Sequence, residues 1–228
     1  MSWIITGAQP IPAVIGEPFG GGYFAGYISH TADGNPTHAL IVAPTATGAT
    51  GGNYTPLTEN KAWALDQLAG NGTNYSTTTI GTVANGAFDG VANMAVFESI
   101  GIENFPAAEF CRNLRIGGYT DWYLPSRFEL DIAYFNLKPT TQENNTSSGI
   151  NNYSVPEITT SYTATYPAQS YVALFNTTQE RFVNASHCSS TEASATQGVL
   201  VNFAAGFSQF SISKTSANRV RAFRRIAL

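Results

Sequence analysis

The sequence contains three histidines, a residue type that often binds metals or acts as a general base. His30 and His38 flank a turn, so a hairpin would bring their imidazoles together as metal ligands or as a general base and its partner. A metal site needs three or four ligands, however, and Asp33 is the acidic residue that lies near them in the sequence. We therefore interpret both histidines as polar residues beside a turn, and we predict no metal site.

The two cysteines, Cys111 and Cys188, are too few for a disulfide scaffold and too far apart for a metal motif. A free thiol behaves as a small apolar group. We interpret them as one buried thiol on a helix and one on a strand, with a redox pair, a metal pair or a disulfide as the alternatives.

Glu129 and Asp131 are the best candidates for a carboxylate pair in acid–base catalysis. Residues two apart on a helix point to different faces, and Glu129 also completes a capping box with Ser126. No serine lies in a G-x-S-x-G motif, and the glycines at 20–22 precede a strand, unlike those of a phosphate-binding loop. We therefore predict no catalytic residue, no cofactor and no enzymatic activity.

Short strands and two helices must position these groups. A strand over 23–30, a turn at 33–36 and a strand over 37–43 form a predicted hairpin. Residues 44–90 lack periodic apolar positions and indicate long loops, with one helical turn around 63–68. Residues 139–170 are rich in Asn, Thr and Ser and form a second long excursion. Further strands are predicted at 171–175, 181–183, 197–203, 207–213 and 219–226.

The helices are predicted from apolar residues at helical spacing. In the first helix these apolar residues end at Leu114, and the glycine pair at 117–118 stops the helix. Asn104 is its expected N-cap, and Pro106 lies in its first turn. The second opens at Ser126 and ends before Pro139. The order of elements predicts an α+β fold with a mostly antiparallel sheet, two helices and long loops, in which the first and last strands pair.

The composition restricts the partners. Charged residues make up 11% of the 228 residues, against about 25% in an average soluble domain. The 14 Phe, 11 Tyr and 3 Trp argue against disorder, so a folded surface of neutral polar groups suits sugars or another protein. A net charge of −4 argues against nucleic acid. No apolar run suits membrane insertion or a signal peptide.

The stretch GGYTDWYLPSRFEL at 117–130 is the most distinctive of the chain. It resembles the G-x-x-D-W-x-L-P-S-x-x-E-L signature of the Lcl C-terminal domain family, named for the globular end of a bacterial collagen-like adhesin. Segments that resemble other motifs of that family follow the same order, at 16–27, 38–43, 111–113, 189–192 and 218–225. Two departures are Cys188, where the family has Trp before S-S-T-E, and the long 139–170 excursion.

The resemblance implies a C-type-lectin-like fold, related to the formylglycine-generating enzyme, over residues 19–228. The enzyme's paired cysteines and the lectins' calcium motifs are absent from the sequence. Family members occur in surface adhesins and bacteriophage virion proteins, often as trimers. We expect the apolar residues 1–18 to form an arm that docks on other virion proteins, in a homo-oligomer such as a trimer.

Two functions follow as expectations. The first is a virion surface protein of a bacteriophage, at a tail or fibre, that binds host glycan or host protein. The alternative is an architectural head or tail decoration protein with no ligand of its own. Because binding sites of such domains lie in loops, we expect ligand contacts from Asn184, His187, Phe207 and Gln209. Asp121, Trp122, Pro125, Ser126 and Glu129 are expected to fix the second helix to the core.

Overall fold

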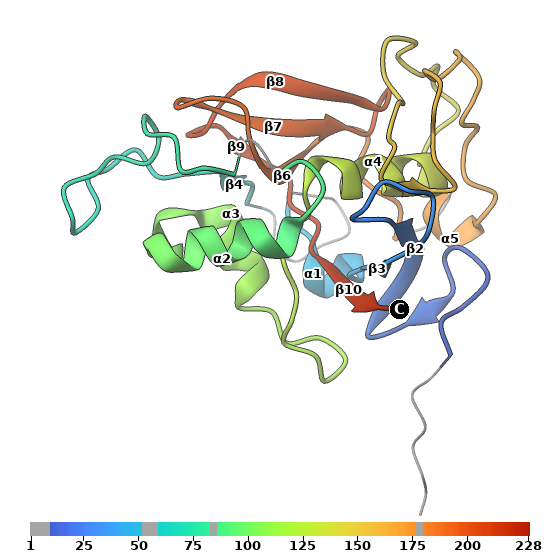
Figure 1. The fold of residues 1–228 in the computed structure, drawn as a ribbon, viewed down its shortest axis with the longest axis horizontal. Coiled ribbons are helices and arrows are strands. Elements are labelled where there is room, and N and C mark those ends of the chain that lie inside the picture. Colours follow the sequence, from blue (N-terminus) through green and yellow to red (C-terminus); the bar gives the residue numbers. More distant parts are fainter. Residues whose placement is uncertain (1–9, 52–58, 83–85, 177–179) are drawn as a thin grey trace, which may run out of the picture.

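The computed structural model describes residues 10–51, 59–82, 86–176 and 180–228, without the side chains of 209–211. The protein is an α+β fold of mostly antiparallel sheets with few helices (Figure 1). The segment 1–9 of the predicted docking arm lies outside the described residues. In the rest of that arm, Ile11 and Ile15 pack against the core, while Val14 is exposed.

The first sheet contains the predicted hairpin, which is confirmed. Its strands are β1 (Pro18–Phe19), β2 (Gly22–Ile28), β3 (His38–Val42), β5 (Ser154–Val155) and β10 (Phe223–Ala227). The expected pairing of the first and last strands is wrong, because β10 pairs with β3. β2 has no edge left for it, since β3 lies along one side and β1 and β5 share the other.

The second sheet has the order β6 (Ser186–Glu192), β7 (Gln197–Asn202) and β8 (Phe207–Ser213). The predicted hairpin of β7 and β8 is confirmed. Its turn contains Gly206 at φ +63°, where an added Cβ would lie 2.0 Å from Cε1 of Tyr134. The remaining pair joins β4 (Lys61–Ala62) to β9 (Ala217–Asn218).

Both predicted helices are confirmed, as α3 (Pro106–Arg112) and α4 (Arg127–Leu137). The capping box of α4 is present, because Glu129 accepts the Ser126 N–H at 2.7 Å. The N-cap assigned to Asn104 is wrong: Phe105 occupies it, and Asn104 ends a short 3-10 turn, Ile102–Asn104, and donates to the Gly101 carbonyl at 2.9 Å. α4 lies between the two sheets and contacts β2, β6 and β7.

Several elements differ from the sequence-based expectation. Helix α2 (Gly90–Ile100) was not predicted, and strand β6 was predicted only at Cys188, without its bounds. The helical turn lies at α1 (Thr45–Gly48) instead of 63–68. The strand expected at 171–175 is a helical turn, α5 (Ala173–Asn176), which buries Phe175. Residues 181–183 form no strand, and the last strand begins at Phe223 because residues 219–222 make only isolated bridges.

Two buried ion pairs tie loops to these sheets. Lys214 Nζ lies 2.5 Å from Glu192 Oε1, and neither side chain is exposed to solvent. Glu192 also accepts the N–H groups of Ile80 and Gly81 at 3.1–3.2 Å, and Lys214 donates to the Thr78 carbonyl at 2.8 Å. Arg221, in the last segment, forms the second pair with Glu180 at 2.8 Å.

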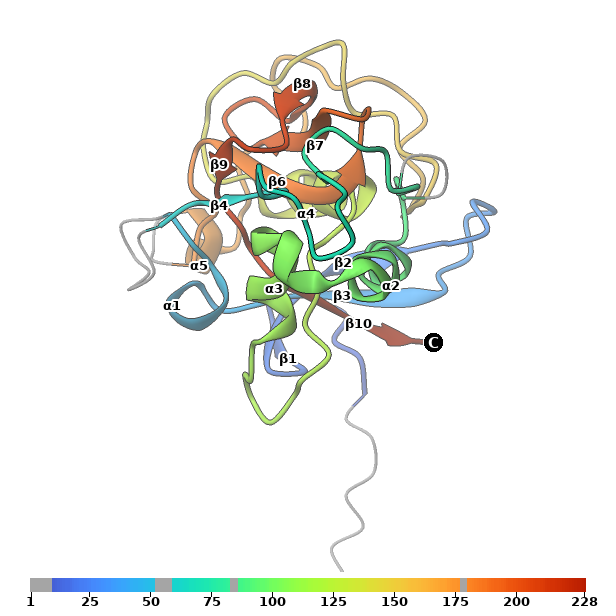
Figure 2. The ribbon, with the colours of Figure 1, turned by 90° about the vertical axis from the view of Figure 1, so that its left-hand side faces the viewer.

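The 139–170 excursion extends away from the N-terminal residues 10–19. In both ribbon views the outer part of the 139–170 excursion lies with β8 at one end of the molecule, and residues 10–19 lie toward the other (Figures 1 and 2). Within the excursion, β5 returns to the edge of β2 that β1 also occupies. The loop of residues 66–78 extends from a third side. A contact made through residues 10–19 would therefore leave the part of the excursion beside β8 exposed.

Candidate functional site

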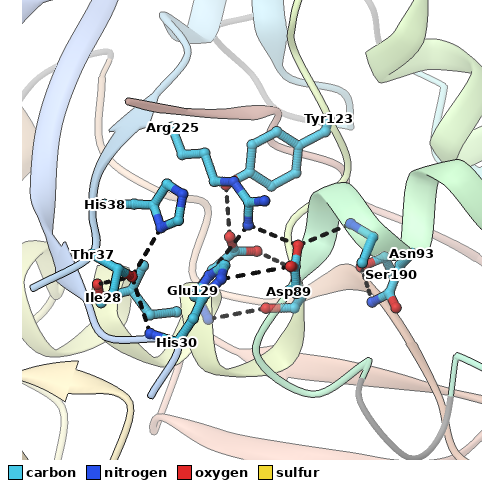
Figure 3. A network of polar contacts seen from close by, with 12 residues as sticks. Ile28, His30, Thr37, His38, Asp89, Asn93, Tyr123, Glu129, Ser190 and Arg225 are labelled. Atoms are coloured by element: carbon cyan, nitrogen blue, oxygen red, sulfur yellow. Dashed lines mark hydrogen bonds and ion pairs between the residues drawn. The ribbon is translucent and has the colours of Figure 1, made fainter. Parts of the chain in front are cut away.

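A polar network around Arg225 contains the two histidines singled out by the sequence (Figure 3). Arg225 Nη1 donates to Asp89 Oδ1 at 2.7 Å and lies 3.2 Å from His30 Nε2. His38 packs beside His30 with ring centroids 4.5 Å apart, so the hairpin does bring them together. Asp89 caps α2 by accepting the Ala92 N–H at 2.8 Å. The network thus joins the first hairpin, α2 and β10.

The geometry defines the charge state of His30. Because Arg225 can only donate, His30 Nε2 accepts, and its proton lies on Nδ1, which is 3.6 Å from Asp89 Oδ2. Burial and Arg225 together lower the pKa of His30 to about 4. Although burial opposes it, the pKa of Asp89 is lowered by the Ala92 N–H and by Arg225. A neutral His30 beside an Arg–carboxylate pair holds these three elements together.

The two carboxylates considered for catalysis face different neighbours. Glu129 Oε1 accepts the Tyr123 hydroxyl at 2.6 Å, and burial raises the pKa of Glu129 despite that hydrogen bond. Asp131 lies 3.6 Å from Arg127, and burial raises its pKa to about 7. They do not form a pair around a common substrate position.

A hollow of about 450 Å³ lies between α2 and the 120–123 segment. Each charged side chain that lines it has an ion-pair partner. The pairs are Arg112–Glu98 at 2.6 Å, Asp121–Arg224 at 2.5 Å and Arg225–Asp89 at 2.7 Å. These charges are therefore already neutralised.

A second hollow, of about 340 Å³, lies where the excursion meets β8; we call it the excursion hollow. Its lining residues are Arg127, Asn145, Ser147, Ser148, Gly149, Ile150, Phe207 and Ser208. Ile150 is exposed, and Arg127 Nε donates to the Ser208 hydroxyl at 2.9 Å. The surface combines hydroxyl and amide groups with two apolar side chains, which is the mixture that sugar rings require.

Asparagine side chains fix the base of this excursion. Asn144 accepts the Tyr134 hydroxyl of α4 at 2.6 Å and donates to the Pro167 carbonyl at 2.9 Å. Asn151 donates to the Phe128 carbonyl at 3.0 Å. A loop held in this way loses little conformational entropy when it binds a ligand.

A third hollow, of about 350 Å³, lies beside the start of the excursion; we call it the arginine hollow. Its lining residues are Gly51, Pro139, Thr140, Arg181, Phe182, Val183, Asn184, Ala185 and Arg219. Phe182 is buried and stacks on Phe203 with centroids 4.1 Å apart, which makes the floor rigid. The hollow could not be expected from the sequence, because 181–183 and 219 were predicted to lie in strands.

The four expected ligand residues do not share one site. Asn184 lines the arginine hollow, and Phe207 lines the excursion hollow. His187 is buried between Phe182 and Phe203, and burial lowers its pKa to about 3. Gln209 lies opposite Leu200 in β8, and its side chain lies outside the described residues.

The residues expected to fix α4 lie close to its N-terminus. Trp122 is buried, and the Pro125 carbonyl accepts the Ser190 N–H of β6 at 2.7 Å. Asp121 pairs with Arg224, whose guanidinium lies 3.7 Å from the centroid of the Tyr119 ring. These contacts join α4 to β6 and to the last strand.

The S-S-T-E segment carries a buried hydrogen-bond system. Ser190 accepts from Asn93 of α2 at 2.8 Å, and Thr191 donates to the Gly86 carbonyl at 2.6 Å. Cys188, just before it, is buried and free, as is Cys111, and burial raises the pKa of both thiols.

Within the described ranges, no three His, Cys, Asp or Glu side chains are grouped as metal ligands. No helix in those ranges has the length and apolar character to cross a membrane.

Comparison with known proteins finds little. No family model matches the chain, and no curated protein matches it. The chain is similar to a solved structure, the crystal structure of a fimbrial protein from Bacteroides ovatus ATCC 8483, with a TM-score of 0.42 and 14% sequence identity. The similarity covers 81% of this chain and 35% of the fimbrial chain, and it is too distant to define a fold family or a function.

Proposed function

We propose that this chain is a bacteriophage virion surface protein, at a tail or fibre, that binds a host surface glycan or protein through a C-type-lectin-like fold. The fold part of the proposal is supported by the motif at 117–130 and by a sheet shared between strands from both ends of the described chain. A three-stranded second sheet and a long excursion with little regular structure agree with it.

The excursion hollow is the observation that carries the binding part. It is preorganised, because Asn144 and Asn151 fix the excursion to α4. It is mostly neutral and lies at the opposite end from residues 10–19 (Figure 2). A protein docked through its N-terminal segment would present this hollow outward, as a receptor-binding tip requires.

Phe207→Ala is expected to weaken glycan binding about tenfold, because the ring supplies apolar contact area in the hollow. The measurement is binding to an array of bacterial surface polysaccharides, followed by biolayer interferometry on the strongest polysaccharide. Leu68→Ala is the matched control, since Leu68 is exposed and lies in the 66–78 loop on another side of the molecule. Equal binding by Phe207→Ala and wild type would exclude this hollow. Wild-type binding to host cells but to no polysaccharide would indicate a protein receptor.

The architectural alternative is favoured by one observation, the exposed Val14 between two residues that pack on the core. A variant without residues 1–9 is expected to fold with an unchanged melting temperature but to be missing from assembled virions. Circular dichroism and electron microscopy of the particles measure the two effects. Normal incorporation of this variant would show that the arm is not the docking element.

A further inference from the structure

The arginine hollow is distinguished by the sign of the charged side chains that line it. Two guanidinium groups, those of Arg181 and Arg219, line a hollow of about 350 Å³ with no Asp or Glu among its described lining residues. The segments 52–58 and 177–179, which adjoin Gly51 and Glu180 in the sequence, contain no Asp or Glu. A positive site of this kind is unusual on a chain with a net charge of −4.

Arg219 is held in position from one side. Its Nε donates to the Gly51 carbonyl at 3.0 Å, while its terminal nitrogens have no hydrogen-bond partner among the described residues. Arg221, two residues on, points inward instead and pairs with Glu180 at 2.8 Å. Glu180, next to Arg181 in the sequence, is thus engaged by the buried Arg221 and not by Arg219, which leaves the charge of Arg219 available to a ligand.

The groups beside the arginines are those that bind sugars. Asn184 is exposed and contacts Gln142 at 3.4 Å, and Thr140 adds a hydroxyl. Arginine binds carboxylates through two parallel hydrogen bonds, with a geometry that lysine lacks. The volume suits one sugar residue better than an extended acidic peptide.

We infer that the arginine hollow binds the carboxylate of an acidic sugar, with Arg219 as the principal carboxylate ligand and Asn184 and Thr140 contacting its hydroxyl groups. This inference rests on the proposed glycan-binding function and adds a second subsite, separate from the excursion hollow. The ligand class is a uronic or other carboxylate-bearing sugar. Neutral sugars would bind elsewhere.

The test is a titration of the ¹⁵N-labelled full chain with D-glucuronate, with D-glucose and tetraglutamate as probes of neutral sugar and acidic peptide. Glucuronate is expected to shift the amide signals of Gly51 and residues 183–185, and glucose is not. Arg219→Gln is expected to weaken glucuronate binding about tenfold with an unchanged melting temperature. Arg219→Lys is expected to restore only part of the affinity.

Phe207→Ala separates this inference from the proposed function, since it is expected to leave glucuronate binding unchanged. If glucuronate causes no shift at 183–185, or binds Arg219→Gln as tightly as wild type, the inference is wrong even where the excursion hollow binds glycans. Shifts at 183–185 with tetraglutamate but not with glucuronate would also overturn it in favour of an acidic peptide.

Discussion

Lys214→Met is expected to lower the free energy of unfolding by about 3–5 kcal/mol, because it leaves the Glu192 carboxylate buried without a counter-charge. The carboxylate keeps its hydrogen bonds from Ile80 and Gly81, but these do not neutralise it. Methionine has a similar length, so the loss reports the charge more than the packing. Urea unfolding followed by tryptophan fluorescence measures it.

Two further variants sharpen this result. Lys214→Met combined with Glu192→Leu removes both charges and is expected to recover part of the lost stability, since an apolar pair carries no desolvation cost. Lys61→Met is the matched control: Lys61 pairs with the exposed Glu59 at 3.6 Å, so a change within about 0.5 kcal/mol is expected. A loss below about 1 kcal/mol for Lys214→Met would show that the pair does not hold residues 78–81 in place.

His187→Asn is expected to change how stability depends on pH. The unfolded chain takes up a proton on His187 near pH 6.5 and the folded chain only near pH 3, so between these values the folded state loses stability as the pH falls. His187 alone would reduce the free energy of unfolding by about 3 kcal/mol between pH 7 and pH 4. Asparagine keeps a donor for the Ala185 carbonyl, which the His187 Nδ1 contacts at 3.1 Å, but does not titrate.

Asp131→Asn is a control that is expected to change the pH dependence of stability in the opposite direction. Burial raises the pKa of Asp131 from 3.8 to about 7, so the folded chain binds more protons than the unfolded chain between those values. Asp131 therefore adds stability as the pH falls. Asp131→Asn is expected to make the free energy of unfolding fall more steeply with decreasing pH, and His187→Asn is expected to make it fall less steeply. Urea unfolding at several pH values distinguishes the two slopes. If both variants shift the profile in the same direction, one of these two pKa shifts is wrong in sign.

The elements that could be predicted from sequence are those with a clear local signal. The hairpin of β2 and β3 and the capping box of α4 depend on turn residues and on Ser126 with Glu129, which lie close together in the chain. Helix α2 was missed because Gly90 and Asn93 occupy its buried face with Met94 and Phe97, which hides the apolar period.

The bounds of strand β6 and the positions of the two hollows could not be predicted for a different reason. β6 buries polar residues on both faces, and their hydrogen-bond partners, such as Asn93 and Gly86, lie about a hundred residues away. The arginine hollow likewise combines Gly51, Thr140, Arg181 and Arg219 from four separate segments. Sequence spacing alone cannot show such groupings.

The internal ion pairs have a consequence for how the protein behaves in different salt solutions. Lys214, Arg221, Arg224 and Arg225 each meet a carboxylate with little of the cation exposed. The outer surface is therefore even poorer in charge than the 11% of charged residues suggests. We expect the binding proposed for the excursion hollow to change little from fresh water to seawater, because there is little surface charge for ions to screen.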